Sequence, residues 1–190
     1  MPPMSTNIFQ TKHTCPWWLC KAFDNPLRRI VHNPEKILAP FVKPGDTVLD
    51  IGCGMGYFTL ALAQLVSEEG RVIAADLQAE MLEGLRQRAS RDGLLERITL
   101  HRSEPTHIGV SGPVDFALAF WMVHEVRDQR TFMQEILGLL HSGGQFLLVE
   151  PRGHVSGKAF DDTVSLALKI GFKIGSNPEV RLSWASLLTK

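Results

Sequence analysis

Residues 47–59 read TVLDIGCGMGYFT, and this stretch decides the fold class. A short apolar run, Thr47 to Ile51, leads into glycines at positions 52, 54 and 56, and an apolar helical pattern follows from Tyr57 to about Ser67. A buried strand that turns directly into a helix is typical of an α/β sheet. Glycines at such a turn let the backbone bend sharply and approach a ligand closely.

The same alternation of strand and helix continues to the end of the chain. Further strands are expected at about 71–75, 98–101, 116–120 and 145–150, and helices at about 78–91, 129–141 and 158–170. Two last strands, at about 172–174 and 183–189, lie too close together for a crossover helix and are expected to pair antiparallel. The predicted fold is α/β: a Rossmann-like, doubly wound sheet of seven strands, mostly parallel, with an antiparallel C-terminal edge hairpin.

The first 35 residues differ from the rest of the chain. Asn25-Pro26 and Asn33-Pro34 each place a capping residue before a proline, which predicts two short helices. We expect residues 1–35 to form a helical cap or lid on a domain of residues 36–190. Trp17 and Trp18 either close the site as an aromatic lid or pack the N-terminal helix on the sheet. The pair Arg28-Arg29 is expected to lie on a solvated helix face.

Composition limits the classes of partner. The 190 residues carry twenty basic and twenty acidic side chains, so the chain lacks the basic excess of most nucleic-acid binders. The longest apolar run, Phe116 to Val123, is far shorter than the ~20 residues that span a bilayer. The start has no signal-peptide pattern, and three cysteines do not make a disulfide framework. We therefore expect a cytoplasmic monomer or homodimer without a nucleic-acid or membrane partner.

Two acids indicate which ligand the glycine turn binds. A dinucleotide fingerprint is G-x-G-x-x-G, whereas this turn is G-x-G-x-G, with Tyr57 where the third glycine belongs. Asp50, directly before the turn, would repel a pyrophosphate and suits a cationic group. Asp76, at the end of the second strand, is placed to accept hydrogen bonds from two ribose hydroxyls. The two acids therefore suggest a nucleoside with a positively charged, phosphate-free tail. This description fits S-adenosylmethionine.

Four stretches resemble the motifs of class I S-adenosylmethionine-dependent methyltransferases. The resemblance is to their small-molecule branch, which includes ubiquinone/menaquinone C-methyltransferases and arsenite methyltransferases. The four stretches are VLDIGCGMGYFT (48–59), VIAADLQAEML (72–82), VDFALAFWMVHEV (114–126) and LHSGGQFLLVEP (140–151). In the last of them Ser142 stands where the family has a proline.

The resemblance implies in-line transfer of a methyl group from S-adenosylmethionine to a small, partly hydrophobic acceptor, with S-adenosylhomocysteine as the product. In the family the third strand ends in Gly-Asp-Ala, whose acid bonds the adenine. Here Ser103 takes that position, so Ser103 or Glu104 is the candidate for this contact. The other expected cofactor-binding residues are Asp50, Gly52, Cys53, Gly54, Gly56, Tyr57, Asp76, Leu77, Gln78, Met81 and Phe120.

His124 is the candidate catalytic residue. It follows the fourth strand at its carboxyl end, where open α/β sheets bind ligands. It is expected to act as a general base or to shape the pocket, and a purely structural role is the alternative. No Asp/Asn-Pro-Pro-Tyr/Phe motif follows this strand, which argues against an exocyclic base amine as the acceptor. Residues 119–122 (AFWM) stand there instead, and we expect them to form an apolar and aromatic wall that suits a small, partly hydrophobic acceptor.

No metal cofactor is expected. Asp128 stands where H-E-x-x-H would need its second histidine, and the acid cluster that holds magnesium in catechol-type O-methyltransferases is missing. His13, Cys15 and Cys20 form H-x-C-x4-C, which is either a metal or metalloid site or a pair of free thiols.

Two other classes of function stay open. One is a catalytically silent cofactor-binding or partner module, suggested by the lack of an inserted substrate domain. The other is a nicotinamide-dependent oxidoreductase, which Asp50 and the missing third glycine disfavour. The atom that receives the methyl group is left open among carbon, nitrogen, oxygen, sulfur and arsenic.

Overall fold

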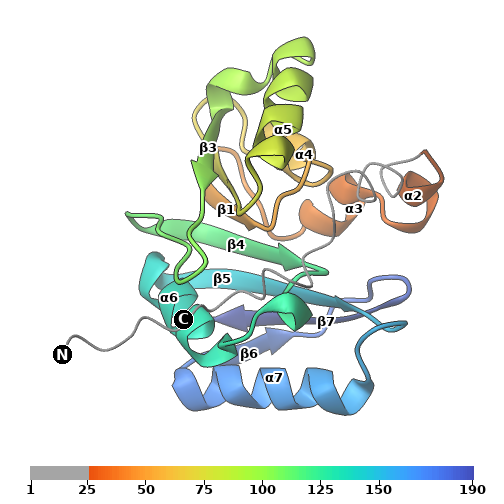
Figure 1. The fold of residues 1–190 in the computed structure, drawn as a ribbon, viewed down its shortest axis with the longest axis vertical. Coiled ribbons are helices and arrows are strands. Elements are labelled where there is room, and N and C mark those ends of the chain that lie inside the picture. The colour runs from red at the N-terminus through yellow and green to blue at the C-terminus, as the bar shows by residue number, and fades with distance from the viewer. Residues whose placement is uncertain (1–25) are drawn as a thin grey trace.

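The computed structural model describes residues 26–190, which form one seven-stranded sheet with helices on both faces (Figure 1). The strand order is β3-β2-β1-β4-β5-β7-β6. Only β7 runs against the others, because it pairs antiparallel with both β5 and β6. The strands are β1 (Thr47–Ile51), β2 (Arg71–Asp76), β3 (Ile98–Arg102), β4 (Val114–Phe120), β5 (Leu140–Pro151), β6 (Lys173–Ser176) and β7 (Ser183–Thr189). The predicted fold class is confirmed.

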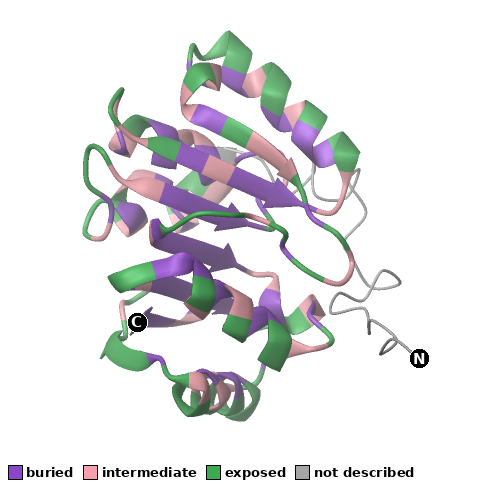
Figure 2. Cartoon of the chain, turned by 90° about the vertical axis from the view of Figure 1, so that its left-hand side faces the viewer, coloured by how far each residue is buried: buried purple, intermediate pink, exposed green. Residues whose placement is uncertain are grey.

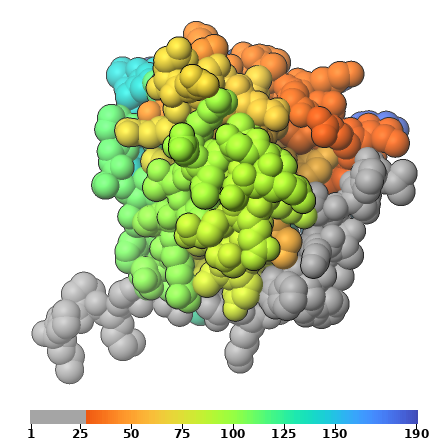
Figure 3. Space-filling view, turned by 90° about the horizontal axis from the view of Figure 1, so that it is seen from above, coloured from red at the N-terminus to blue at the C-terminus, as the bar shows by residue number. Residues whose placement is uncertain are grey.

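The helices divide between the two faces of the sheet. Buried side chains of α3, α4 and α5 pack in one cluster, and those of α6 and α7 pack in the other. Figure 3 looks onto the molecule from the side of α5. The helices are α2 (Pro26–Val31), α3 (Pro34–Leu38), α4 (Thr59–Leu65), α5 (Ala79–Arg91), α6 (Gln129–Leu139) and α7 (Gly157–Ile170), with short 3-10 turns η1 (Leu95–Arg97) and η2 (Val123–Glu125).

The central strands are buried on both faces (Figure 2). In β1, Val48 packs into the cluster under α4 and α5, whereas Leu49 and Ile51 pack into the cluster under α6 and α7. Residues 116–120 of β4 are all buried. Such continuous apolar strands are expected in a parallel sheet that is covered on both sides.

The N-terminal helices begin at the predicted prolines. Asn33 caps α3, because its side-chain oxygen accepts a hydrogen bond from the backbone N–H of Lys36 at 3.0 Å. The predictions that concern His13, Cys15, Trp17, Trp18 and Cys20 lie outside the described residues. The cap or lid role of residues 1–35 therefore stays a prediction.

Several boundaries differ from those predicted. β4 and β5 begin earlier than expected, because Val114 pairs with Leu140 before the register shifts and regular pairing resumes at Phe116. α4 begins at Thr59 rather than at Tyr57, because the glycine turn continues to Phe58. Within residues 26–190, no helix combines the length and the apolar character needed to cross a membrane.

The strand order sets where a ligand binds. The chain runs from β1 outward to β2 and β3, and then returns to β4 on the other side of β1 before continuing to β5. Open α/β sheets bind ligands at such a switch point, outside the carboxyl ends of the strands. β1 ends at the glycine turn and β4 ends next to His124, so the predicted site lies at this edge.

Candidate active site

The glycine turn is fastened to the neighbouring strand. Gly52 and Cys53 both donate their backbone N–H to the carbonyl oxygen of Ala75 in β2, at 2.8 and 3.2 Å. Gly52 and Gly54 have φ values of +69° and +54°, a region that favours glycine. A Cβ atom on Gly54 would have no atom within 4 Å, so this part of the turn faces open space.

Asp76 joins the turn to the end of β2. Its Oδ2 accepts the backbone N–H of Gly54 and its Oδ1 accepts that of Gln78, both at 2.9 Å. The carboxyl is buried, and burial raises its pKa although these hydrogen bonds oppose the shift. A carboxylate has about four lone-pair positions, so Asp76 retains acceptor capacity for two hydroxyl groups.

Asp50 lies deeper, at the end of β1. It is 3% exposed, and its Oδ2 accepts the hydroxyl of Thr59 at 2.6 Å. Burial raises the pKa of Asp50 to about 7, the Thr59 hydrogen bond opposes the shift, and the negative charge of Asp76 adds to it. Among residues 26–190, no donor bonds the second oxygen, Oδ1.

A cavity of about 640 Å³ collects these groups at the carboxyl edge of the sheet. All of the predicted site residues line it except Gly56 and Glu104. Gly56 instead packs the turn against α5, because a Cβ there would come within 2.3 Å of Leu85 Cδ1. Ser103 is buried and lines the cavity, while Glu104 is exposed, its backbone pairs with His107 and it does not line the cavity.

His124 lies in η2, at the end of the cavity away from Ser103, and a buried acid holds it. The Oε2 of Glu150 is 2.5 Å from the Nδ1 of His124, and the Oε1 of the same carboxylate accepts the backbone N–H of His124 at 3.1 Å. These contacts assign the proton to Nδ1 and leave Nε2 as the second ring nitrogen. The hydrogen bond with Glu150 raises the pKa of His124, although burial opposes the shift.

Sequence reasoning missed Glu150. It is the only acid of β5, the strand next to β4, and it lies near the carboxyl end of that strand, at the same sheet edge as His124, which was the available signal. It lies behind the imidazole rather than on the cavity wall.

Sequence reasoning was wrong about Arg28. Its guanidinium lines the cavity and lies 4.3 Å from the centroid of the Tyr57 ring and 5.7 Å from that of Trp121. The hydroxyl of Tyr57 donates in turn to the carbonyl oxygen of His32 at 2.8 Å. The helix pattern of residues 26–31 carried no sign of this, because the sheet edge that Arg28 approaches comes from segments far along the chain.

Trp121 and Met122 line the cavity where the sequence places an apolar and aromatic wall, whereas Leu182 was not predicted. Trp121 and Leu182 both have a positive φ, of 61° and 56°, which is rare for bulky residues. Such strained positions gather at functional sites. Further residues that line the cavity at this end are Glu125, Pro151, Arg152, Gly153 and His154.

The chain was compared with known proteins. It is 31% identical over 117 residues to a demethylmenaquinone methyltransferase of Symbiobacterium thermophilum. This match covers 61% of this chain and 47% of that protein. It is 29% identical over 124 residues to the ubiquinone/menaquinone biosynthesis C-methyltransferase UbiE of Teredinibacter turnerae, which covers 63% of this chain and 50% of that protein. The chain therefore spans about half the length of these two relatives.

A solved structure shares the whole fold. The crystal structure of a SAM-dependent methyltransferase from Aquifex aeolicus superposes with a TM-score of 0.80 and 24% identity, over 92% of this chain and 98% of that one. The methyltransferase domain family matches residues 48–144, which is more than half of the chain and includes the glycine turn, Asp76 and His124. The chain belongs to the methyltransferase domain family.

Proposed function

We propose that this protein is an S-adenosylmethionine-dependent methyltransferase that acts on a small, partly apolar acceptor. The observation that carries the proposal is the pair of buried carboxylates, Asp50 and Asp76, on one cavity beside the glycine turn. Asp76 suits a ribose in either cofactor, but Asp50 at the glycine turn would repel a pyrophosphate and suits a cationic methionine tail. This argues against a nicotinamide cofactor.

The lining residues fit the parts of S-adenosylmethionine in order along the cavity. Ser103 suits the adenine and Asp76 the ribose hydroxyls. Asp50 suits the ammonium or sulfonium charge, and Arg28 suits the carboxylate of the methionine tail. The open space at Gly54 leaves room for the ligand against the backbone.

S-adenosylmethionine, when bound, would supply an electrophilic methyl group whose bonding pair to sulfur stays on sulfur while an electron pair of the acceptor forms the new bond to carbon. The protein contributes alignment, which is worth up to ~7–11 kcal/mol of barrier. For an acceptor that carries a proton, neutral His124 takes that proton at Nε2, and Glu150 stabilises the imidazolium that results.

The comparisons support a small-molecule acceptor, since the two relatives are named for steps on demethylmenaquinone and in ubiquinone/menaquinone biosynthesis. The oriented His124–Glu150 pair supports an enzyme over a silent cofactor-binding module. The cytoplasmic location, the monomer or homodimer and the lack of a nucleic-acid partner stay predictions of the sequence.

The proposal is tested by calorimetry with S-adenosylmethionine, S-adenosylhomocysteine and NAD. We expect the first two to bind and NAD not to bind. Asp76→Ala should weaken the binding of S-adenosylmethionine and of S-adenosylhomocysteine roughly ten- to hundred-fold, because hydrogen bonds to a charged group contribute ~1.5–3 kcal/mol. The control is Glu80→Ala, an exposed acid in the first turn of α5. Retention of NAD alone, or a folded Asp76→Ala protein with unchanged affinity, would overturn the assignment.

A further inference from the structure

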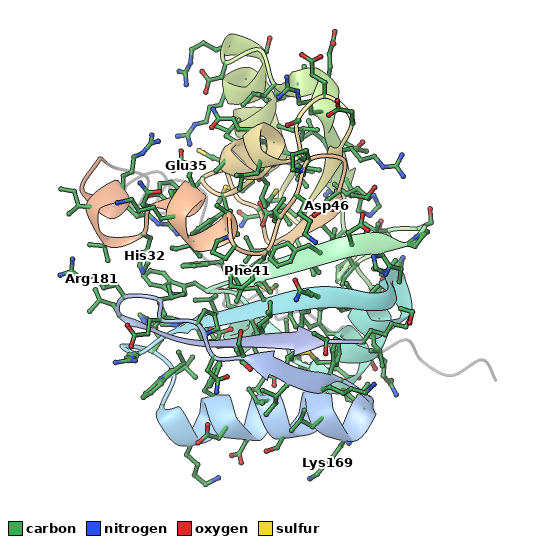
Figure 4. The ribbon with its side chains drawn as sticks, turned by 180° about the vertical axis from the view of Figure 1, so that it is seen from behind. His32, Glu35, Phe41, Asp46, Lys169 and Arg181 are labelled. Carbon is green, nitrogen blue, oxygen red and sulfur yellow. The ribbon has the colours of Figure 1, made fainter. Side chains whose placement is uncertain are left out.

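Arg181 and Leu182, directly before β7, and Ser183, its first residue, connect the segments that form the end of the cavity near His124. The carbonyl oxygen of Arg181 accepts from the Nε2 of buried His32 at 2.7 Å, and Figure 4 shows these two residues side by side. The hydroxyl of Ser183 accepts from the indole N–H of Trp121 at 2.9 Å. The N-terminal helices, β4 and β7 are therefore joined at one point of the cavity rim.

Arg152 is held by the same segment. Its backbone N–H donates to the carbonyl oxygen of Leu182, and its Nε donates to that of Ser183, both at 3.0 Å. Its guanidinium carbon also lies 4.4 Å from the centroid of the Trp184 ring. These contacts fix the guanidinium by its Nε and by its flat face, so its two Nη groups remain for another partner.

No acid among residues 26–190 forms an ion pair with Arg152, although the side chain lines the cavity. His154 lines the same end, and its ring lies 6.1 Å from that of His124. A cation that is held in place at a cavity and lacks an internal acid is a ready partner for an anionic ligand.

We propose that Arg152 binds a carboxylate on the methyl acceptor, so that the substrate class is a small acid with an apolar body. The apolar body would lie against Trp121, Pro151 and Leu182. This inference rests on the proposed function, because the proposed function assigns the part of the cavity beside Ser103, Asp76 and Asp50 to the cofactor.

The test uses matched acids and amides as probes on the full chain saturated with S-adenosylhomocysteine. The pairs are benzoate with benzamide, and 4-hydroxybenzoate with 4-hydroxybenzamide, with binding followed by saturation-transfer NMR and calorimetry. We expect at least one acid to bind about tenfold or more tightly than its amide, because a carboxylate pairs with both Nη groups of Arg152. Arg152→Gln should remove this preference, and Arg152→Lys should keep part of it.

The controls separate this inference from the proposed function. Arg130→Gln removes an exposed arginine of α6 that does not line the cavity and should leave the preference unchanged. Arg152→Gln should bind S-adenosylhomocysteine as tightly as the wild type does. Failure of the wild type to bind S-adenosylhomocysteine would overturn the proposed function. Normal binding of it with no acid preferred over its amide would overturn the acceptor assignment alone, and so would loss of S-adenosylhomocysteine affinity in Arg152→Gln.

Discussion

Asp50 and Asp76 are both buried at the cavity, but their carboxylates are stabilised to different extents. Asp76 accepts two backbone N–H groups that compensate part of its burial. Asp50 has the Thr59 hydroxyl and an acidic neighbour, and its pKa rises to about 7. Without a ligand, Asp50 is therefore close to half protonated at neutral pH, and a cationic ligand would favour its charged form.

Cofactor affinity should consequently depend on pH through Asp50. As the pH falls from 7.5 to 5.5, Asp50 becomes protonated in the free protein, and the dissociation constant of S-adenosylmethionine should rise by up to about tenfold per pH unit below 7. This window stays below the ~8 at which an α-amino group loses its own proton. Calorimetry across the range measures the effect. Asp50→Asn should bind more weakly and show almost no pH dependence, and an unchanged slope in this variant would contradict the prediction.

The stability of the free protein should change in the opposite sense. The folded-state pKa of Asp50, about 7, lies above its ordinary value of 3.8, so its contribution to stability is fully present below about pH 4 and is lost as the pH rises through 7. Asp50→Asn without ligand should therefore unfold at a higher temperature than the wild type at pH 8. Calorimetric melting would show whether binding and stability conflict at this residue. A lower melting temperature would mean that the Thr59 hydrogen bond outweighs the burial of charge.

Glu150 should control the titration of His124. NMR titration of the wild type should give a His124 pKa above 6.5, because Glu150 stabilises the imidazolium. Glu150→Gln should lower the His124 pKa, since burial is then opposed only by the charge of Glu125. The amide introduced by this substitution would also favour the wrong tautomer, so methyl transfer to a protic acceptor should fall by ~10²–10⁴. His141, whose pKa is raised by the Ser142 carbonyl and by Asp115, should not respond. A His124 pKa unchanged by Glu150→Gln would refute the pairing.

At the scale of elements, the glycine turn combines two tasks. Gly54 faces open space at the cavity, whereas Gly56 is pressed against fully buried Leu85 of α5. Gly56→Ala should therefore destabilise the fold by ~1–3 kcal/mol through overpacking, in addition to the strain of its φ of +87°. Gly54→Ala should reduce the stability of the fold only through the strain of its positive φ, but it should weaken the binding of S-adenosylhomocysteine. Urea unfolding and calorimetry on both variants measure the two effects, and equal losses of stability would contradict this division.

Most elements could be predicted because their signals are local. The continuous apolar run of 116–120 and the spacing of Met81, Leu82, Leu85 and Ala89 mark a buried strand and an amphipathic helix without tertiary information. The early starts of β4 and β5 could not be predicted from the sequence, because they depend on the pairing of Val114 with Leu140. The site divides in the same way. The sequence predicted the site residues of the strand–turn–helix motif. It could not predict Arg28, Arg152 and Leu182, because they reach the cavity only when folding brings distant segments together at the sheet edge.

At the scale of the molecule, the N-terminal helices lie at the mouth of the cavity. Arg28 of α2 lines it, and His32 connects this part of the chain to Arg181. Ile30 is 72% exposed on the same helix, and Leu182, which follows Arg181 in the chain and lines the cavity, is 63% exposed. The described part of the chain therefore begins, with α2, beside the cavity.

The sequence prediction that Trp17 and Trp18 close the site can be tested by deletion and substitution. Deletion of residues 1–20 should weaken the binding of S-adenosylhomocysteine by about tenfold or more, because burying one large apolar side chain contributes ~1.5–3 kcal/mol. Trp17→Ala/Trp18→Ala should reproduce most of the loss in the full-length chain. Indole fluorescence should change on ligand addition, and the change should shrink in Trp17→Phe/Trp18→Phe, since only Trp121 and Trp184 then report. Circular dichroism and melting checks that each variant keeps its fold. If the shortened protein binds the ligand as tightly as the full chain, the two tryptophans do not cover the cofactor, and the cavity is closed by residues 26–190 alone.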